Sequence, residues 1–357
     1  MFDRMEKFNI LSNRTSKRYR LYSALPYNYV PVTLEIHPTN KCNSSCKFCA
    51  FSNLNSLYSK ELSQKRFINL MDEIVKLNVK SVVFAGGGEP ALYPLICDGI
   101  DYLVLNGVDV GITTNGLFMN NKISNSLRKC SWVRFSLLTS NESDYEILTG
   151  NPQNYFKKIC DNIKFFTSSF DKKTSCIPSA SYMTGVKFDS IDRLYDFILL
   201  SKSLNLSQIF IKPIVSKFRK PSSSKNSFYI DSKEKIIEFA NSNCIVTNLN
   251  KFLSQEQSTF MRKSVGESCS VIDKNLIGLI TANGDYYPCL RQYVKYGISY
   301  GNIEDFSLKK LINSGKRKEI QNKECDFCRH WSLRSEIYKF EKTNKIEKCC
   351  DPHYNFL

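Results

Sequence analysis

Three cysteines, Cys42, Cys46 and Cys49, form a C-x3-C-x2-C motif directly after a strand-like run at residues 32–36. Closely spaced thiolates of this kind can hold three irons of a cubane iron–sulfur cluster, which needs four ligands to be closed. An iron without a protein ligand can bind a small molecule, as an open position does in catalytic metal sites. A structural zinc site or chance clustering are the alternatives. Structural zinc prefers four closed ligands and C-x2-C pairs, so the motif fits zinc poorly.

A glycine-rich turn follows the next strand-like run, residues 79–84, and reads Gly87-Gly88-Glu89-Pro90. Glycines at the end of a strand let the backbone approach a ligand closely, and proline sets up the turn. Taken alone, such a segment is more often only a turn.

In this order, the two segments resemble the radical S-adenosylmethionine (SAM) enzymes. In that family the three cysteines ligate a 4Fe–4S cluster, and its open iron binds the amino and carboxylate groups of SAM. The resemblance places the aromatic ring of Phe48 against the adenine. It also assigns Gly87, Gly88 and Glu89 to the site that receives the methionine ammonium of SAM.

Two further strand ends resemble positions that line the SAM pocket in this family. The run at residues 108–113 leads into Asn115-Gly116, and the run at residues 132–138 contains Ser136. Ser136 matches a position that often bonds to the ribose. Alternatively, Asn115 only makes a turn with Gly116, and Ser136 is an ordinary sheet residue.

Strand-like and helical patterns alternate through the first two-thirds of the chain. The expected strands cover residues 32–36, 79–84, 108–113, 132–138, 175–182 and 208–215. The expected helices cover residues 61–77, 94–105, 122–129, 155–166 and 192–204. Repeated β–α units call for parallel strands. They fit the α/β partial (β/α)6 TIM-type barrel of the radical SAM family, with ligands at the C-terminal ends of the strands.

The last third of the chain carries a second set of four cysteines. These are Cys269, Cys289, Cys325 and Cys328. A hairpin pattern around Asn283-Gly284 precedes the second of them, and a helical segment at residues 308–321 precedes the final C-x2-C pair. Four cysteines can close an iron–sulfur cluster or a zinc ion, and zinc is the serious alternative for these residues alone.

After a radical SAM core, this arrangement resembles a small α+β domain of the twitch type, the short form of the SPASM extension. That module holds one auxiliary 4Fe–4S cluster, whereas a full SPASM domain continues with more cysteines for a second. Here the next cysteines are the adjacent pair Cys349 and Cys350, so we expect one auxiliary cluster. One of this pair could instead replace an assigned ligand.

The remaining cysteines and the histidines are not assigned to a site. We expect five cysteines to be small buried hydrophobes: Cys97, Cys130, Cys160, Cys176 and Cys244. We expect His37, just before the cysteine motif, to be a hydrogen-bonding neighbour rather than a ligand.

The expected domains are an N-terminal extension (residues 1–30), a radical SAM core (31–230) and a twitch/SPASM-like domain (231–357), with an exposed connection at 217–228. The sequence contains no membrane span and no signal peptide. Fourteen cysteines in such a chain predict a cytoplasmic location and metal ligation rather than disulfides. The net charge of +16 is spread along the chain. We therefore expect a solvated basic surface and no nucleic-acid partner, with an anionic substrate as the second choice.

The resemblance implies a radical SAM oxidoreductase. With an electron from a donor such as flavodoxin or ferredoxin, SAM would be cleaved to a 5′-deoxyadenosyl radical that abstracts a substrate hydrogen atom. The auxiliary 4Fe–4S cluster would accept the remaining electron. We expect a carbohydrate or cyclitol-like substrate; the alternative is a peptide maturase, for which residues 1–30 are too few to form a leader-binding domain. A non-enzymatic iron–sulfur or zinc protein is the third hypothesis.

Overall fold

The computed structural model describes residues 30–49, 51, 60–171, 174–186, 189–214, 227–249, 252–253, 272, 275–290 and 292–316. Residues 1–29 of the predicted N-terminal extension, most of the predicted connection and five of the C-terminal cysteines lie outside these residues. The five cysteines are Cys269, Cys325, Cys328, Cys349 and Cys350.

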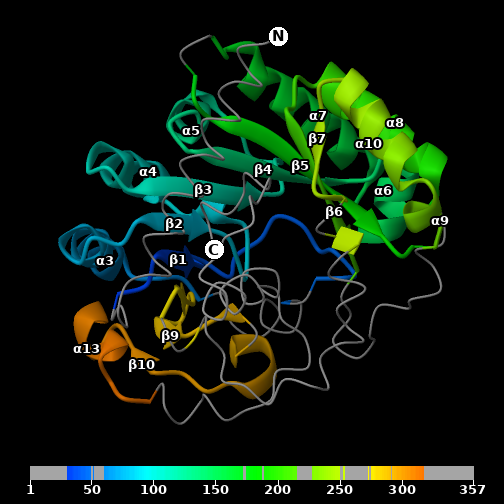
Figure 1. The fold of residues 1–357 in the computed structure, drawn as a ribbon. Coiled ribbons are helices and arrows are strands. Elements are labelled where there is room, and N and C mark those ends of the chain that lie inside the picture. The colour runs from blue at the N-terminus through cyan, green and yellow to red at the C-terminus, as the bar shows by residue number, and fades with distance from the viewer. Residues whose placement is uncertain are drawn as a thin grey trace, which may run out of the picture.

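Parallel strands alternate with helices through the first two-thirds of the chain, as the sequence predicts (Figure 1). The first six strands are β1 (Thr33–Ile36), β2 (Ser81–Phe84), β3 (Asp109–Thr114), β4 (Trp132–Leu138), β5 (Ile177–Thr184) and β6 (Gln208–Pro213). They pair in chain order, each parallel to the next. The helices between them are α3 (Gln64–Lys76), α4 (Ile96–Leu105), α5 (Asn121–Leu127), α6 (Glu142–Thr149), α7 (Gln153–Ser168) and α8 (Ile191–Ser203).

One face of the sheet packs against the helices. Leu34 and Ile36 of β1 belong to a buried core that also contains Phe67, Leu70 and Ile74 of α3. Those three side chains recur at helical spacing, so they form one apolar stripe directed at the sheet. Because side chains alternate along a strand, the residues between the core positions face the opposite, inner side of the sheet.

The sheet continues beyond the six predicted strands on both sides. At one edge, β7 (Val246–Thr247) pairs in parallel with β6, after α9 (Ser227–Asp231) and α10 (Lys233–Ser242). At the other edge, β8 (Ile277–Ile280) pairs in parallel with β1. Within the described residues the sheet has ten strands in the order β10-β9-β8-β1-β2-β3-β4-β5-β6-β7. This α/β partial barrel confirms the predicted fold class.

The described C-terminal segment contributes strands to this same sheet. Strands β8 and β9 (Asp285–Tyr287) form the predicted antiparallel hairpin, and β10 (Gly301–Asn302) pairs with β9. A π-helical turn (Gln292–Tyr296) and helix α13 (Leu308–Ile312) complete the described segment. The sequence prediction omitted α6, α9, α10 and β7. Strands from before and after residue 230 belong to the same sheet. The division into domains at that residue therefore stays a prediction.

Across the residues that the structure describes, no helix combines the length and the apolar character needed to span a membrane.

Candidate functional site

The three-cysteine motif lies in a loop that follows the C-terminal end of β1. Cys42 is exposed, while Cys46 and Cys49 are half-buried. A tight turn closes the loop, because the backbone N–H of Cys49 donates to the carbonyl oxygen of Cys46 at 3.1 Å. The N–H of Lys47 donates to the carbonyl oxygen of Thr149 at 3.0 Å, which fixes the loop to the end of α6.

Asn151, which the sequence reasoning missed, holds the middle of the cysteine loop. Its side-chain oxygen accepts the backbone N–H of Ser45 at 3.0 Å. Its amide nitrogen donates to Ser44 Oγ at 2.7 Å and lies 3.6 Å from Cys46 Sγ. Helix α6 ends at Gly150 with a left-handed φ of 76° and so presents Asn151 to the loop. The Gly-Asn-Pro turn after a helix was the sequence signal for this position.

Glu89 lies at the C-terminal end of β2 with only 3% of its surface exposed. Its carboxylate accepts three hydrogen bonds: from the Ala91 N–H at 3.0 Å, the Thr114 hydroxyl at 2.6 Å and the Asn115 N–H at 2.6 Å. Burial raises the pKa of Glu89, and the three hydrogen bonds oppose that rise. Among the described residues no cationic side chain pairs with this carboxylate.

Asn115 connects Glu89 to the cysteine loop. Besides its backbone bond to Glu89, its side-chain amide donates to Asn43 Oδ1 at 2.7 Å and lies 3.9 Å from Cys42 Sγ. Asn115 follows β3, as Glu89 follows β2, so two adjacent parallel strands deliver both groups to the same edge of the sheet. The structure therefore brings these sequence-predicted residues together.

The glycine-rich turn packs directly against the segment that leads into the cysteine loop. The N–H of Gly88 donates to the carbonyl oxygen of Thr39 at 3.0 Å. A Cβ atom on Gly88 would collide with the backbone of Asn40 and Lys41, and one on Gly87 would collide with the Asn40 side chain. Only glycine permits this approach at position 88, where the obstacle is backbone; at position 87 the obstacle is the end of the Asn40 side chain.

Phe48 and Ser136 also lie at this end of the barrel. Phe48 is half-buried and packs against the hydrophobic core. Ser136 is half-buried on the inner face of β4, next to an irregularity in the pairing with β5 between Phe135 and Leu138. Leu138 has a left-handed φ of 76°, which is uncommon for a residue with a branched side chain. Bulges of this kind often re-aim side chains next to active sites.

The chemistry of the donor set fits a cubane cluster with an open iron and a cationic ligand group beside it. Although Cys42 reaches the surface, partial desolvation of its thiol, together with Glu89, Cys46 and Cys49, raises its pKa to about 11. Within the described residues no three His, Cys, Asp or Glu side chains converge on a point where one metal ion could sit. Cubane thiolates bind different irons, so they need not converge in that way. Glu89 is a buried carboxylate with no cation beside it among the described residues, and the ammonium of an amino acid would supply one.

The C-terminal cysteine set is only partly described. Cys289 is half-buried and follows β9, so the predicted hairpin presents it next to the edge of the sheet. The assignments of Cys269, Cys325 and Cys328 stay predictions, as do those of the SAM-site residues.

The cysteines outside both sets follow the sequence expectation in part. Cys97, Cys130 and Cys176 are buried, as expected, and Cys160 is half-buried. The expectation is wrong for Cys244, which is exposed. Cys244 lies in the left-handed turn that ends α10, with a φ of 59°, and such a turn lies at the surface.

His37, just before the cysteine loop, makes the hydrogen bond that we expected of it. Its Nε2 atom lies 2.9 Å from Glu35 Oε1 on β1. The ring is 1% exposed and packs edge-on against Phe51 and Tyr293, which come from the cysteine loop and the C-terminal segment.

Two protein-family descriptions match the chain. The radical SAM superfamily matches residues 36–198, a range that contains the three-cysteine motif, the glycine-rich turn, Asn115 and Ser136. The SPASM iron–sulfur cluster-binding domain matches residues 269–330, a range that contains all four cysteines of the second set.

Curated relatives resemble the chain at moderate identity. It is 26% identical over 283 residues to a probable GTP 3′,8-cyclase of Methanosarcina acetivorans, across 74% of this chain and 79% of that protein. It is 31% identical over 109 residues to the mycofactocin maturase MftC of Mycobacterium ulcerans, across 30% of this chain and 29% of that protein.

Solved structures share the fold. Streptococcus suis SuiB superposes with a TM-score of 0.60 at 16% identity, across 80% of this chain and 66% of that one. The structure of anSMEcpe with bound AdoMet superposes with a TM-score of 0.58 at 16% identity, across 91% and 95%. At these identities the likeness concerns the fold alone. From the two family matches, the chain belongs to the radical SAM superfamily and carries a C-terminal SPASM-type domain; it is an enzyme that uses S-adenosylmethionine and 4Fe–4S clusters.

Proposed function

We propose that Cys42, Cys46 and Cys49 hold the SAM-binding 4Fe–4S cluster and that Glu89 receives the ammonium of SAM. The observation that carries this proposal is the buried Glu89 carboxylate, which has no cationic partner among the described residues and is linked through Asn115 to the cysteine loop. A cluster with an open iron and a carboxylate for the ammonium are the two contacts that the methionine end of SAM requires.

When bound, the cluster and SAM supply one-electron cleavage of SAM and abstraction of a hydrogen atom from an unactivated carbon. The chain's own residues orient the reactants. Gly87 and Gly88 let the backbone lie against the cysteine loop, and Ser136 faces the inner side of the barrel, where it would reach the ribose. An external one-electron donor such as flavodoxin or ferredoxin would supply the electron for the cleavage of SAM.

We further propose that Cys269, Cys289, Cys325 and Cys328 hold one auxiliary 4Fe–4S cluster that accepts the electron left on the substrate. A closed cluster has no open iron for substrate, so electron transfer is the role that its chemistry permits. The match of the SPASM description over all four cysteines and the position of Cys289 beside β9 support this assignment. The net reaction would then be an oxidation.

For the substrate we propose a peptide or protein, which was the alternative on sequence grounds. The maturase MftC is 31% identical over 30% of this chain, and SuiB has been solved bound to the precursor peptide SuiA, with a fold that covers 93% of this chain. A carbohydrate or cyclitol remains the second candidate, because the four-cysteine set matches a single auxiliary cluster as in the twitch module. The strands carry buried polar side chains, which can form hydrogen bonds with either class of substrate.

The experiment compares the two classes directly. Reconstituted protein, SAM and a one-electron reductant are incubated with a short peptide encoded beside the gene, or with sugars and cyclitols. A peptide substrate should raise 5′-deoxyadenosine formation above the substrate-free rate and emerge lighter by two hydrogens or carrying an internal crosslink. A sugar converted to a ketone, with the peptide unchanged, would select the second candidate.

A further inference from the structure

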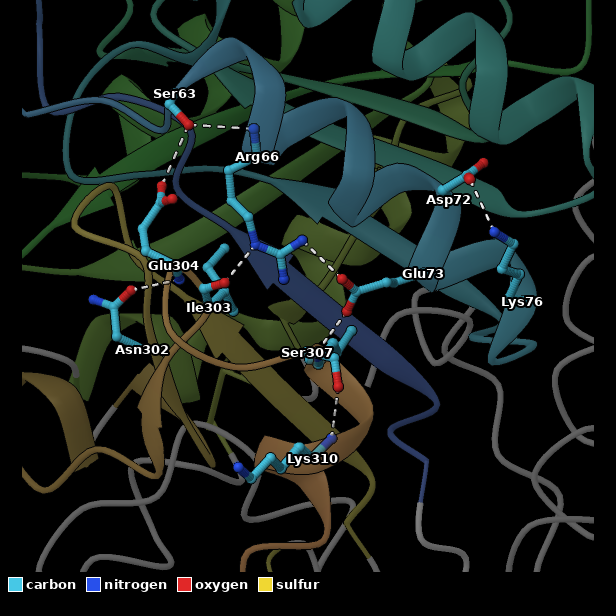
Figure 2. Close-up of polar contacts among 11 residues, drawn as sticks. Ser63, Arg66, Asp72, Glu73, Lys76, Asn302, Ile303, Glu304, Ser307 and Lys310 are labelled. Atoms are coloured by element: carbon cyan, nitrogen blue, oxygen red, sulfur yellow. Dashed lines mark hydrogen bonds and ion pairs between the residues drawn. The ribbon is translucent and has the colours of Figure 1, made fainter.

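Helix α3 of the barrel is tied to the C-terminal segment by a partly buried ion pair (Figure 2). Arg66 and Glu73 join through Arg66 Nη1 and Glu73 Oε1 at 2.8 Å. The Nε atom of Arg66 donates to the carbonyl oxygen of Ile303 at 2.5 Å. Glu73 Oε2 accepts the backbone N–H of Leu308 at 2.5 Å. We call these four residues the α3 clamp.

The clamp is sensitive to the loss of the Glu73 charge. Arg66 is 8% exposed, and its Nη2 atom is buried with no hydrogen-bond partner among the described residues. The guanidinium therefore depends on Glu73, whose side chain is 25% exposed, and on the Ile303 carbonyl oxygen for the bonds that offset its burial. Loss of the Glu73 carboxylate would leave the buried guanidinium without its anionic partner, which is more disruptive than the loss of a surface pair.

Glu73 also caps α13 from outside that helix. Leu308 is the first residue of α13, and its N–H is one of the donors that have no partner inside a helix. A carboxylate at this end also interacts favourably with the helix dipole. Ser307 caps the same helix by accepting the N–H of Lys310. Glu73 therefore adds a second cap, from outside the helix, to the one that the local sequence provides.

A second ion pair on α3 shows what is specific to the clamp. Asp72 and Lys76 lie 3.1 Å apart on the same helix, with 48% and 75% of their side chains exposed (Figure 2). Among the described residues, the hydrogen-bond partners of this pair lie within α3 and α4, and none belongs to the C-terminal segment. Like the pair in the clamp, this pair joins an anionic and a cationic side chain of α3, but among the described residues it makes no bond to α13.

The position of the clamp along the chain suggests its role. The ladder between β8 and β1 fixes the hairpin that leads to Cys289. Helix α13 comes later and precedes Cys325 and Cys328 in the sequence. We infer that Arg66 and Glu73 are positioning residues, which fix α13, and with it the chain that continues toward Cys325 and Cys328, against the barrel and the hairpin that leads to Cys289. This inference rests on the proposed auxiliary cluster.

The first test needs neither cluster nor substrate. Hydrogen exchange is measured over residues 304–312 in the wild type, in Glu73→Ala and in the control Lys76→Ala. Exchange at the Leu308 amide should accelerate at least tenfold in Glu73→Ala and stay at the wild-type rate in the control. Glu73→Gln, which keeps the shape but not the charge, should lie between them and serves if the alanine variant does not fold. Wild-type protection in both Glu73 variants would overturn the inference.

The second test distinguishes positioning from plain stabilisation. In reconstituted, fully reduced protein, pulsed electron paramagnetic resonance reports the magnetic coupling between the two clusters. Glu73→Ala at wild-type iron content should broaden or shift this coupling, whereas Lys76→Ala should not. Unchanged coupling would overturn the positioning role. If even the wild type shows no second cluster, the proposed function fails instead, and the exchange experiment still decides whether the clamp holds α13.

Discussion

The two cysteine sets of this chain are organised in opposite ways. Cys42, Cys46 and Cys49 fall within one short loop, and side chains such as Asn115 and Asn151 of the same barrel hold that loop. The second set extends from Cys269 to Cys328. The described part of the C-terminal segment is joined to the barrel by contacts between residues far apart in the sequence. One example is the hydrogen bond from Arg66 to the Ile303 carbonyl oxygen, 237 residues apart.

The difference teaches how each site is expected to assemble. A short loop loses little entropy when its ends are fixed, so the first set is arranged by local turns and neighbouring strand ends. For the second set, we expect the pairing of β8 with β1 and the contact of α13 with α3 to come first, because these contacts fix the described chain around Cys289 and before Cys325.

The largest expected effect comes from removing the local set. Replacement of Cys42, Cys46 and Cys49 together by alanine should lower the iron of anaerobically reconstituted protein from about eight to about four per chain. SAM cleavage should fall to background, because no open iron remains. Iron analysis and 5′-deoxyadenosine measurement check both results. A wild type that saturates near four irons and binds zinc at the C-terminal set would break the comparison.

The reciprocal change should spare the first site. Cys289→Ala removes one proposed ligand of the auxiliary cluster, while the ligands of the SAM cluster come from another part of the chain. Hydrogen abstraction should continue, but oxidised product should fail for want of an electron acceptor. The measurement is the ratio of 5′-deoxyadenosine to product with deuterated substrate. If folded Cys289→Ala protein that is shown to lack the auxiliary cluster still forms product at the wild-type ratio, the cluster has a structural role and does not accept the electron.

A smaller effect is expected from the carboxylate beside the first cluster. Glu89→Gln keeps the shape of the side chain but removes the charge that would pair with the ammonium of SAM. A hydrogen bond to a charged group is worth about 1.5–3 kcal/mol, so SAM affinity should fall roughly 10–150-fold. Equilibrium binding to reconstituted protein checks this. Undiminished affinity would make Glu89 only a turn residue.

The smallest effect concerns the loop itself. Asn151→Ala removes hydrogen bonds to Ser44 and Ser45, and each neutral bond contributes about 0.5–1.5 kcal/mol. Cluster retention during dilution should weaken measurably, while Gln153→Ala, which removes an exposed bond to Glu146, should have no effect. Equal behaviour of the two variants would show that Asn151 does not organise the loop.

Sequence patterns predicted the barrel because its strands are strongly apolar and follow one another in pairing order. They also placed Glu89 and Asn115 after strands, and parallel strands end at one edge, so the structure brings these two residues together; their role in binding SAM stays a prediction. The patterns missed β7, which is only two residues long, and the parallel pairing of β8 with β1, since no local signal encodes a partner so distant in the chain. Arg66 and Glu73 read as ordinary helix-surface charges, because their partners Ile303 and Leu308 lie 237 and 235 residues further along the chain.

The most direct test of the account uses the Cys289→Ala variant, in which the proposed SAM cluster should be the only paramagnetic centre after reduction. Its electron paramagnetic resonance spectrum is recorded before and after addition of SAM. If Cys42, Cys46 and Cys49 leave one iron open for SAM, the g-values should shift on addition of SAM, and Glu89→Gln in the same background should require more SAM for the same shift. A cluster spectrum that saturating SAM leaves unchanged would contradict the central claim.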